Sequence, residues 1–163
     1  MCEPHPTSPM PHSDAKCLIR RATLADVPQL CELLTLLFSQ ESDFTPDPAR
    51  QTRALRLIIE QPAVGQIYCA ATEEVIMGMV SILFTISTAE GGLAAWLEDM
   101  VVHPGHRGKG VGNKLLEEAT RQSRAVGCSR ITLLTDAANT RAQRFYQRAG
   151  FGRSQMVPFR LSL

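Results

Sequence analysis

The sequence lacks the features that mark several classes of protein. Its five cysteines are an odd number and none is spaced as CxxC, so reduced thiols are favoured over a disulfide framework. Its most apolar stretch, residues 75–86, is too short to span a bilayer. The first 15 residues lack the apolar segment of a signal peptide. These absences favour a cytoplasmic protein with no membrane partner.

The sequence also lacks an excess of either charge. It has 17 Lys and Arg against 16 Asp and Glu, a formal net charge of +1, which argues against nucleic acid as a partner. A chain of 163 residues can bury roughly two-thirds of its unfolded surface in one domain. Residues 1–15 contain four prolines and few core-forming residues, so we expect a disordered tail and a single domain over residues 16–163.

Apolar periodicity predicts four helices and at least six strands. The predicted helices are residues 24–39, 48–61, 111–126 and 140–150. The predicted strands are residues 17–23, 66–72, 75–87, 93–102 and 129–136, with one or two closing strands in 151–163. Consecutive strands favour an antiparallel meander, and the strand–helix–strand segment around residue 111 favours a parallel pair. The predicted fold class is therefore α/β with a mixed, mostly antiparallel sheet and helices on both faces.

Four glycines lie between the predicted strand at residues 93–102 and the end of the first turn of the predicted helix at residues 111–126. Residues 105, 108, 110 and 112 are all glycine, interleaved with Arg107 and Lys109. Bare backbone at a helix start presents N–H donors and a partial positive charge to an anion, so this stretch is typical of a phosphate site. The dinucleotide-binding motif G-x-G-x-x-G is not matched. Its third glycine would fall on Asn113 if the motif began at Gly108, or on Leu115 if it began at Gly110. The P-loop motif is not matched either, because Val111 and Gly112 stand where it requires Lys and Ser or Thr.

The remaining pattern is R-x-x-G-x-G, from Arg107 to Gly112, and it resembles the signature of the GNAT superfamily of N-acetyltransferases. A second motif, "NTRAQRFYQRAGF" from Asn139, resembles that family's downstream segment. The resemblance covers roughly residues 19–159. It implies the GNAT acyltransferase fold, acetyl-CoA as cosubstrate and no metal.

The resemblance also implies which residues bind the coenzyme. Main-chain groups of one strand would pair with its pantetheine arm, the glycine loop would hold its pyrophosphate, and two residues downstream would complete the site. These residues are Met100, Val101, Val102, Arg107, Gly108, Lys109, Gly110, Val111, Gly112, Asn113, Asn139 and Tyr146. Asn139 also suits a helix N-cap, and either role is compatible with the other.

Two adjacent carboxylates, Glu98 and Asp99, interrupt the apolar strand before the loop. Burying them without partners is costly, and strand alternation predicts that they face opposite sides of the sheet. Burial would raise the pKa of a carboxyl group, which suits a general base. "LED" at this point resembles the spermidine/spermine N-acetyltransferases, which implies Glu98 as the base. Asp99 is the second candidate for a catalytic or substrate-binding role, and a structural ion pair is the alternative for both.

Tyr146 lies on an apolar helical stripe and reads as a core residue. The resemblance implies that it also protonates the departing thiolate. Cys128 has no motif around it that would activate a thiol, and His103, next to Pro104, reads as a loop residue.

The resulting hypothesis is direct transfer of an acetyl group from acetyl-CoA to a primary amine in a ternary complex. Glu41, Asp43 and Asp47 hint at a small cationic acceptor. The alternative acceptor is a protein amine. The alternative functions are a non-catalytic acyl-CoA-binding module and a nucleic-acid-binding domain, although the near-neutral net charge argues against the latter. The resemblance is also compatible with a homodimer that forms through the C-terminal strands.

Overall fold

The computed structural model describes residues 17–40 and 45–162. The predicted tail, with Cys2, lies outside the described residues, and so do Glu41 and Asp43. Four helices and five strands, with two short 3₁₀ turns, follow the predicted order up to the last helix. They are β1 (Leu18–Arg21), η1 (Leu24–Asp26), α1 (Val27–Phe38), α2 (Pro48–Glu60), β2 (Gly65–Ala71), β3 (Ile76–Ser87), β4 (Gly92–Val102), η2 (Pro104–His106), α3 (Val111–Ala125), β5 (Ile131–Leu133) and α4 (Thr140–Arg148).

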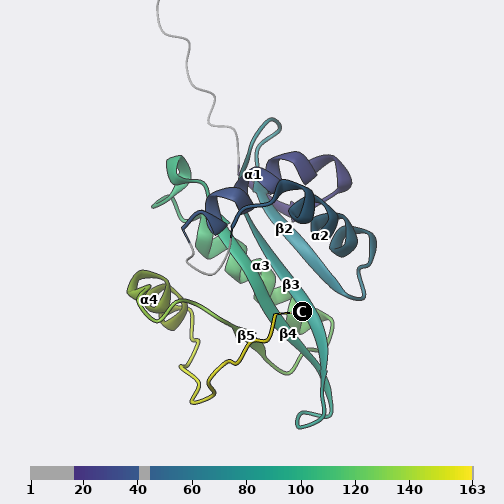
Figure 1. Ribbon diagram of the computed structural model, residues 1–163, viewed down its shortest axis with the longest axis vertical. Coiled ribbons are helices and arrows are strands. Elements are labelled where there is room, and N and C mark those ends of the chain that lie inside the picture. Colours follow the sequence, from purple (N-terminus) through teal and green to yellow (C-terminus); the bar gives the residue numbers. More distant parts are fainter. Residues whose placement is uncertain (1–16, 41–44, 163) are drawn as a thin grey trace, which may run out of the picture.

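The described strands form one mixed sheet in the order β1-β2-β3-β4-β5. The first three pairings are antiparallel and β4 pairs with β5 in parallel, which confirms the predicted meander and parallel pair. Helices α1 and α2 lie together on one side of the strands, and α3 lies behind them (Figure 1). The sheet is therefore covered on both faces, as predicted.

Each face of the sheet carries its own apolar core. On one face, Leu30 of α1 and Leu55 of α2 are buried in a cluster with Met79 of β3. On the other face, Leu115 of α3 is buried with Ile82 of β3. Side chains alternate along β3, so this strand contributes to both cores and lies at the centre of the packing.

The helix starts that the sequence predicts are formed by side-chain caps. The Asp47 carboxylate accepts hydrogen bonds from the backbone N–H groups of Ala49 and Arg50, which fixes the start of α2. Asn139 caps α4 by accepting a hydrogen bond from Ala142 N at 3.0 Å. The N-cap role of Asn139 is thus confirmed.

The C-terminal strands are a wrong prediction for the residues that the structure describes. Residues 151–162 form no strand, and β5 is confined to three residues. A strand needs an edge to pair with, and no strand edge pairs with this segment. Four of its apolar side chains, Met156, Val157, Phe159 and Leu161, are exposed, Phe159 at 96%. In the described parts of the chain no helix is long and apolar enough to cross a membrane.

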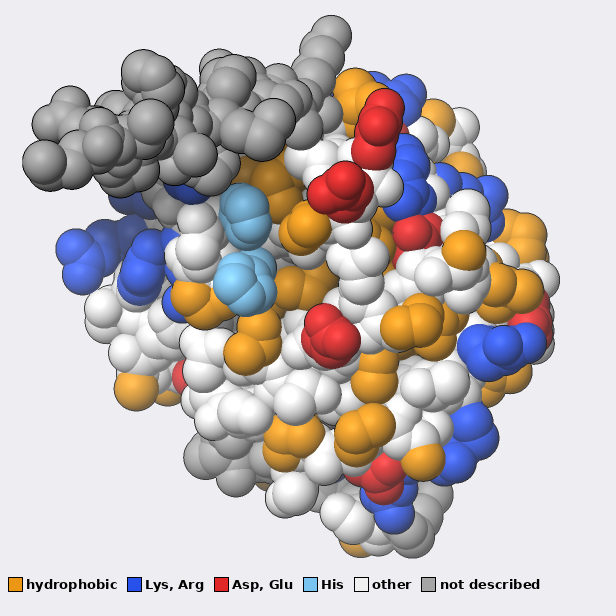
Figure 2. Space-filling view, turned by 90° about the horizontal axis from the view of Figure 1, so that it is seen from above, with side chains coloured by type: hydrophobic (Ala, Val, Ile, Leu, Met, Phe, Trp, Pro, Cys, Tyr) orange, Lys and Arg blue, Asp and Glu red, His pale blue; other side chains and the backbone are white. Residues whose placement is uncertain are grey.

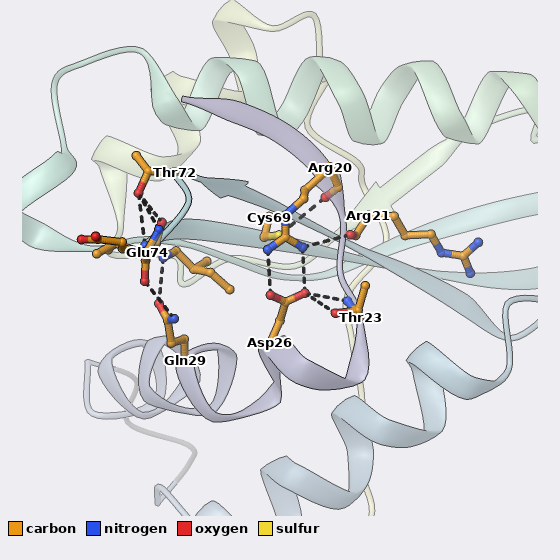
Figure 3. Close-up of polar contacts among 10 residues, drawn as sticks. Arg20, Arg21, Thr23, Asp26, Gln29, Cys69, Thr72 and Glu74 are labelled. Carbon is orange, nitrogen blue, oxygen red and sulfur yellow. Dashed lines mark hydrogen bonds and ion pairs between the residues drawn. The ribbon is translucent and has the colours of Figure 1, made fainter. Parts of the chain in front are cut away.

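An ion pair ties β1 to the start of α1 (Figure 3). The Arg20 guanidinium donates to both carboxylate oxygens of Asp26, at 2.7 and 2.8 Å. The same carboxylate accepts from the backbone N–H and the hydroxyl of Thr23, at 2.7 and 2.9 Å. The Arg20 hydrogen bonds, with those from Thr23, lower the pKa of Asp26 from 3.8 to about 2.

We expect Asp26→Asn to lower the free energy of unfolding at pH 7 by about 1–3 kcal/mol, because a partly buried, charge-assisted pair is lost. The folded-state pKa of Asp26 lies below its unfolded value, so this stabilisation is complete above roughly pH 5 and is lost as the pH falls toward 2. Urea unfolding of both proteins at several pH values measures it. Asp47→Asn, at an exposed cap that Asn also fills well, is the control. A deficit that stays constant down to pH 3 would contradict the assignment.

Candidate active site

The glycine-rich turn adopts a backbone conformation that explains its composition. Gly108 has φ +76° and Gly110, the N-cap of α3, has φ +78°. Side-chain-bearing residues rarely adopt this left-handed region. A Cβ added at either glycine would meet no atom within 4 Å, so backbone conformation and not crowding selects glycine there. The turn exposes main-chain groups at the positive end of α3.

Two cationic side chains brace the turn from within. Arg107 Nε donates to the carbonyl of Val102 at 2.9 Å, and Lys109 Nζ donates to the carbonyl of Gly105 at 3.1 Å. Both residues are exposed, so their charges add to the positive end of α3. His103 Nδ1 accepts from the backbone N–H of Gly105 at 3.2 Å, which matches its predicted loop role. An anionic group fits this chemistry.

The structure brings the predicted residues of β4, α3 and α4 together. A Cβ at Gly112 would lie 3.6 Å from Phe145 Cζ and 3.7 Å from Met100 Cε. The Tyr146 hydroxyl lies 3.8 Å from Met100 Sδ. Segments that are distant in sequence therefore meet beside the C-terminal half of β4, as the interpretation of the two motifs requires.

The C-terminal half of β4 has no strand partner on one side. Residues 95–97 pair with β5, and the described residues show no pairing of β5 with Glu98–Val102. This edge retains backbone donors and acceptors that an extended ligand could use. Val101 is buried and Val102 is half-buried, so their side chains pack in the protein while their main chains form the edge.

A β-bulge lies at the start of this unpaired stretch. Val80 pairs with Met100 and Ile82 pairs with Leu97, so Glu98 and Asp99 together oppose Ser81. The extra residue breaks the side-chain alternation, and the prediction that the two carboxylates face opposite sides is wrong. The next two observations place both of them toward α1 and α2.

Asp99 is placed by its contact with Ser81. Val80 and Ile82 belong to the core on the α3 face, so alternation turns Ser81 to the α1 and α2 face. The Ser81 hydroxyl donates to Asp99 Oδ2 at 2.8 Å, which puts Asp99 on that face too. Leu97 is in the α3-side core, so Glu98, the next residue, turns away from α3 as well.

The two carboxylates differ in environment. Burial raises the pKa of Asp99 from 3.8 to about 6, opposed by the Ser81 hydrogen bond and reinforced by the neighbouring charge of Glu98. Glu98 is exposed. The raised carboxyl pKa that suits a general base therefore belongs to Asp99.

The Tyr146 hydroxyl is a neutral donor in this site. Its ring makes edge-on contacts with Phe145 and Phe151, with centroids 5.2 and 5.7 Å apart. Burial raises the pKa of Tyr146 to about 12, so the hydroxyl keeps its proton at neutral pH. Burial also raises the pKa of the Cys128 thiol, which disfavours a thiolate nucleophile at that position.

A separate hollow of about 440 Å³ lies between α1 and the start of β3. Its lining includes Gln29, Glu32, Ile76 and the imidazoles of His103 and His106. Figure 2 shows the two pale-blue imidazoles beside orange apolar side chains. Its lining includes neither Glu98 nor Asp99, so this hollow is distinct from the bulge.

The sequence interpretation missed Ser81. Its only signal is a hydroxyl within the apolar run "GMVSIL" of β3. Nothing along the chain links it to Asp99, because the two residues are 18 positions apart and the bulge register brings them together.

Comparisons with known proteins identify a family. The Acetyltransferase (GNAT) family matches residues 27–151. An aminoalkylphosphonate N-acetyltransferase of Salmonella typhimurium is 28% identical over 85% of this chain and 86% of its own. A glucosamine 6-phosphate N-acetyltransferase of Trypanosoma brucei brucei is 31% identical over 54% of this chain and 58% of its own.

Solved structures share the fold. A possible acetyltransferase from Clostridium difficile 630 has a TM-score of 0.81, with 90% of this chain and 97% of that chain covered. Its identity is 14%, so this likeness concerns the fold alone.

We expect Gly110→Ala to weaken acetyl-CoA binding at least about tenfold, because an L-residue resists the left-handed backbone that presents the turn. Gly127→Ala is the matched control. Gly127 also has a positive φ, +87°, and open space around it, but it follows the far end of α3. Titration calorimetry on both variants measures affinity, and thermal unfolding measures stability. Equal losses of affinity in the two variants would contradict a site at the turn.

Proposed function

Because this chain belongs to the acetyltransferase (GNAT) family, we propose that it transfers the acetyl group of acetyl-CoA directly to a small primary amine. The single observation that carries the proposal is the left-handed glycine turn at the start of α3, adjoining the unpaired edge of β4. The first element suits a pyrophosphate, and the second suits an extended pantetheine arm.

The chain's own groups suffice to hold such a cosubstrate. Main-chain N–H groups from Gly108 to Asn113 would face the pyrophosphate, with the charge of Arg107 and Lys109 nearby. The β4 edge at Met100–Val102 would pair with the arm, and Asn139 at the start of α4 would contact it. Acetyl-CoA supplies the acetyl group as an activated thioester.

Proton transfer falls to side chains around the bulge. A primary amine arrives as an ammonium ion and must lose a proton before it becomes a nucleophile. Asp99, with a pKa of about 6, is ionised at neutral pH and is our first choice as acceptor of that proton. The exposed Glu98 is the second choice, acting directly or through water. Tyr146 donates a proton to the leaving thiolate, and strand-β4 N–H groups stabilise the oxyanion.

The acceptor we favour is a small amine that also carries a phosphoryl or phosphonyl group. The names of two relatives, one acting on aminoalkylphosphonate and the other on glucosamine 6-phosphate, support this class. The cationic acceptor that the sequence hinted at loses part of its support, because the Asp47 carboxylate is used as the α2 cap. A protein amine is the alternative acceptor, and the amine panel tests it. A homodimer stays a prediction from the family resemblance.

We expect thiol release from acetyl-CoA with a panel of aminoalkylphosphonates, amino-sugar phosphates, polyamines and peptides to show turnover on one small-amine class. Asp99→Asn should lower kcat about 100-fold or more, and Tyr146→Phe should lower it by at least about tenfold, with acetyl-CoA affinity unchanged. Glu117→Gln, on the exposed face of α3, and Tyr68→Phe are matched controls.

The pattern of losses discriminates between the hypotheses. Loss in Glu98→Gln but not in Asp99→Asn would transfer the base role to Glu98. Turnover on peptides alone would favour a protein acceptor. Tight acetyl-CoA binding with no turnover on any amine would favour a non-catalytic module and reject the proposed reaction.

The pH dependence follows from the same carboxyl group. A base must be deprotonated, so kcat/KM should rise with pH through about 6, the pKa of Asp99, and fall about tenfold per pH unit below it. Initial rates from pH 5 to 9 at subsaturating amine measure this limb. A value of kcat/KM that does not fall between pH 7 and pH 5 would contradict Asp99 as the base.

A further inference from the structure

Ser81 occupies the position opposite the bulge. It lies in the middle of β3, is 0% exposed and stands between Val80 and Ile82, both buried in the α3-side core. A hydroxyl buried at this depth costs free energy unless it is hydrogen-bonded. Its bonding partners therefore decide what it contributes.

Both partners of Ser81 belong to one residue. The hydroxyl donates to Asp99 Oδ2 at 2.8 Å and accepts from the backbone N–H of Asp99 at 3.0 Å. One bond holds the carboxylate and the other holds the main chain at the extra residue of the bulge. Together they fix the direction of the carboxylate relative to the unpaired edge of β4.

We propose that Ser81 is a positioning residue, whose paired hydrogen bonds hold the β4 bulge and orient the Asp99 carboxylate for proton acceptance. The inference rests on the proposed function insofar as it takes Asp99 as the proton acceptor. It adds a residue that touches neither substrate and acts only through Asp99.

The groups around Asp99 determine how loss of the Ser81 hydroxyl changes the pKa of Asp99. Among the described residues, burial and the charge of Glu98 raise the pKa of Asp99, and the Ser81 hydrogen bond lowers it. Glu98 comes from the same strand. Four elements pack against β4, namely β3, α1, α3 and β5. Among their described residues, the Ser81 hydroxyl of β3 is the group that shifts the pKa of Asp99. Removing that donor therefore favours the protonated acid.

The test is the pH profile of kcat/KM for Ser81→Ala. We expect its acid limb to move up by about one pH unit, which lowers the rate about tenfold below pH 6 and leaves most of it at pH 9. Ser81→Thr, which keeps the hydroxyl, should restore the limb. Ser81→Cys, nearly isosteric with a weak donor, should shift it in the same direction as Ala.

Ser87→Ala is the matched control, because it removes another buried β3 hydroxyl that bonds Glu90 and Arg130 away from the bulge. It should leave the limb in place. An equal loss of rate at every pH in Ser81→Ala and Ser81→Cys, or an unmoved limb in both, would overturn the positioning role.

A readout without turnover keeps the two proposals separate. Carbon-detected NMR titration of the Asp99 carboxyl in the free protein should give a higher pKa in Ser81→Ala than in wild type. Absence of turnover in wild type would reject the proposed reaction, while this titration would still decide the effect of Ser81 on Asp99. An unchanged Asp99 pKa would reject the inference whatever the activity.

Discussion

The bulge in β4 is the constraint on which the rest of the site depends. One extra residue between Leu97 and Met100 places Glu98 and Asp99 opposite a single residue of β3. The ladder with β3 resumes beyond it, whereas the pairing with β5 does not. The bulge thus lies at the point where the edge of β4 becomes free for a ligand. It also turns the carboxylates of Glu98 and Asp99 toward the α1 and α2 face.

The glycine turn supplies the second constraint, from the opposite end of this edge. Left-handed backbone at Gly108 and Gly110 lets the chain leave β4 and start α3 within a few residues. Arg107 returns a hydrogen bond to the carbonyl of Val102 at the end of the strand. This bond ties the turn that precedes α3 to the end of β4, so a long ligand could contact both the turn and the free edge.

The two cores of the sheet extend up to these irregularities, since Val101 is buried in one core and Val111 in the other. Leu30, Leu55 and Met79 pack on one face, and Ile82 and Leu115 on the other, all with little or no exposure. The Arg20–Asp26 pair connects β1 to the start of α1. Asp99 belongs to neither core, so Asp99→Asn tests function without removing apolar packing.

The sequence by itself determined the order of elements up to α4, the helix cap at Asn139, and the glycine turn. Each of these depends on local propensity or on hydrogen bonds within a few residues. The tertiary structure alone decided which carboxylate is buried, because the bulge register depends on pairing with β3. It also decided the role of Ser81, 18 positions from its partner. It also left residues 151–162 without a strand, because a strand forms only through ladder hydrogen bonds to a neighbouring strand, and such pairing is not decided by the local sequence.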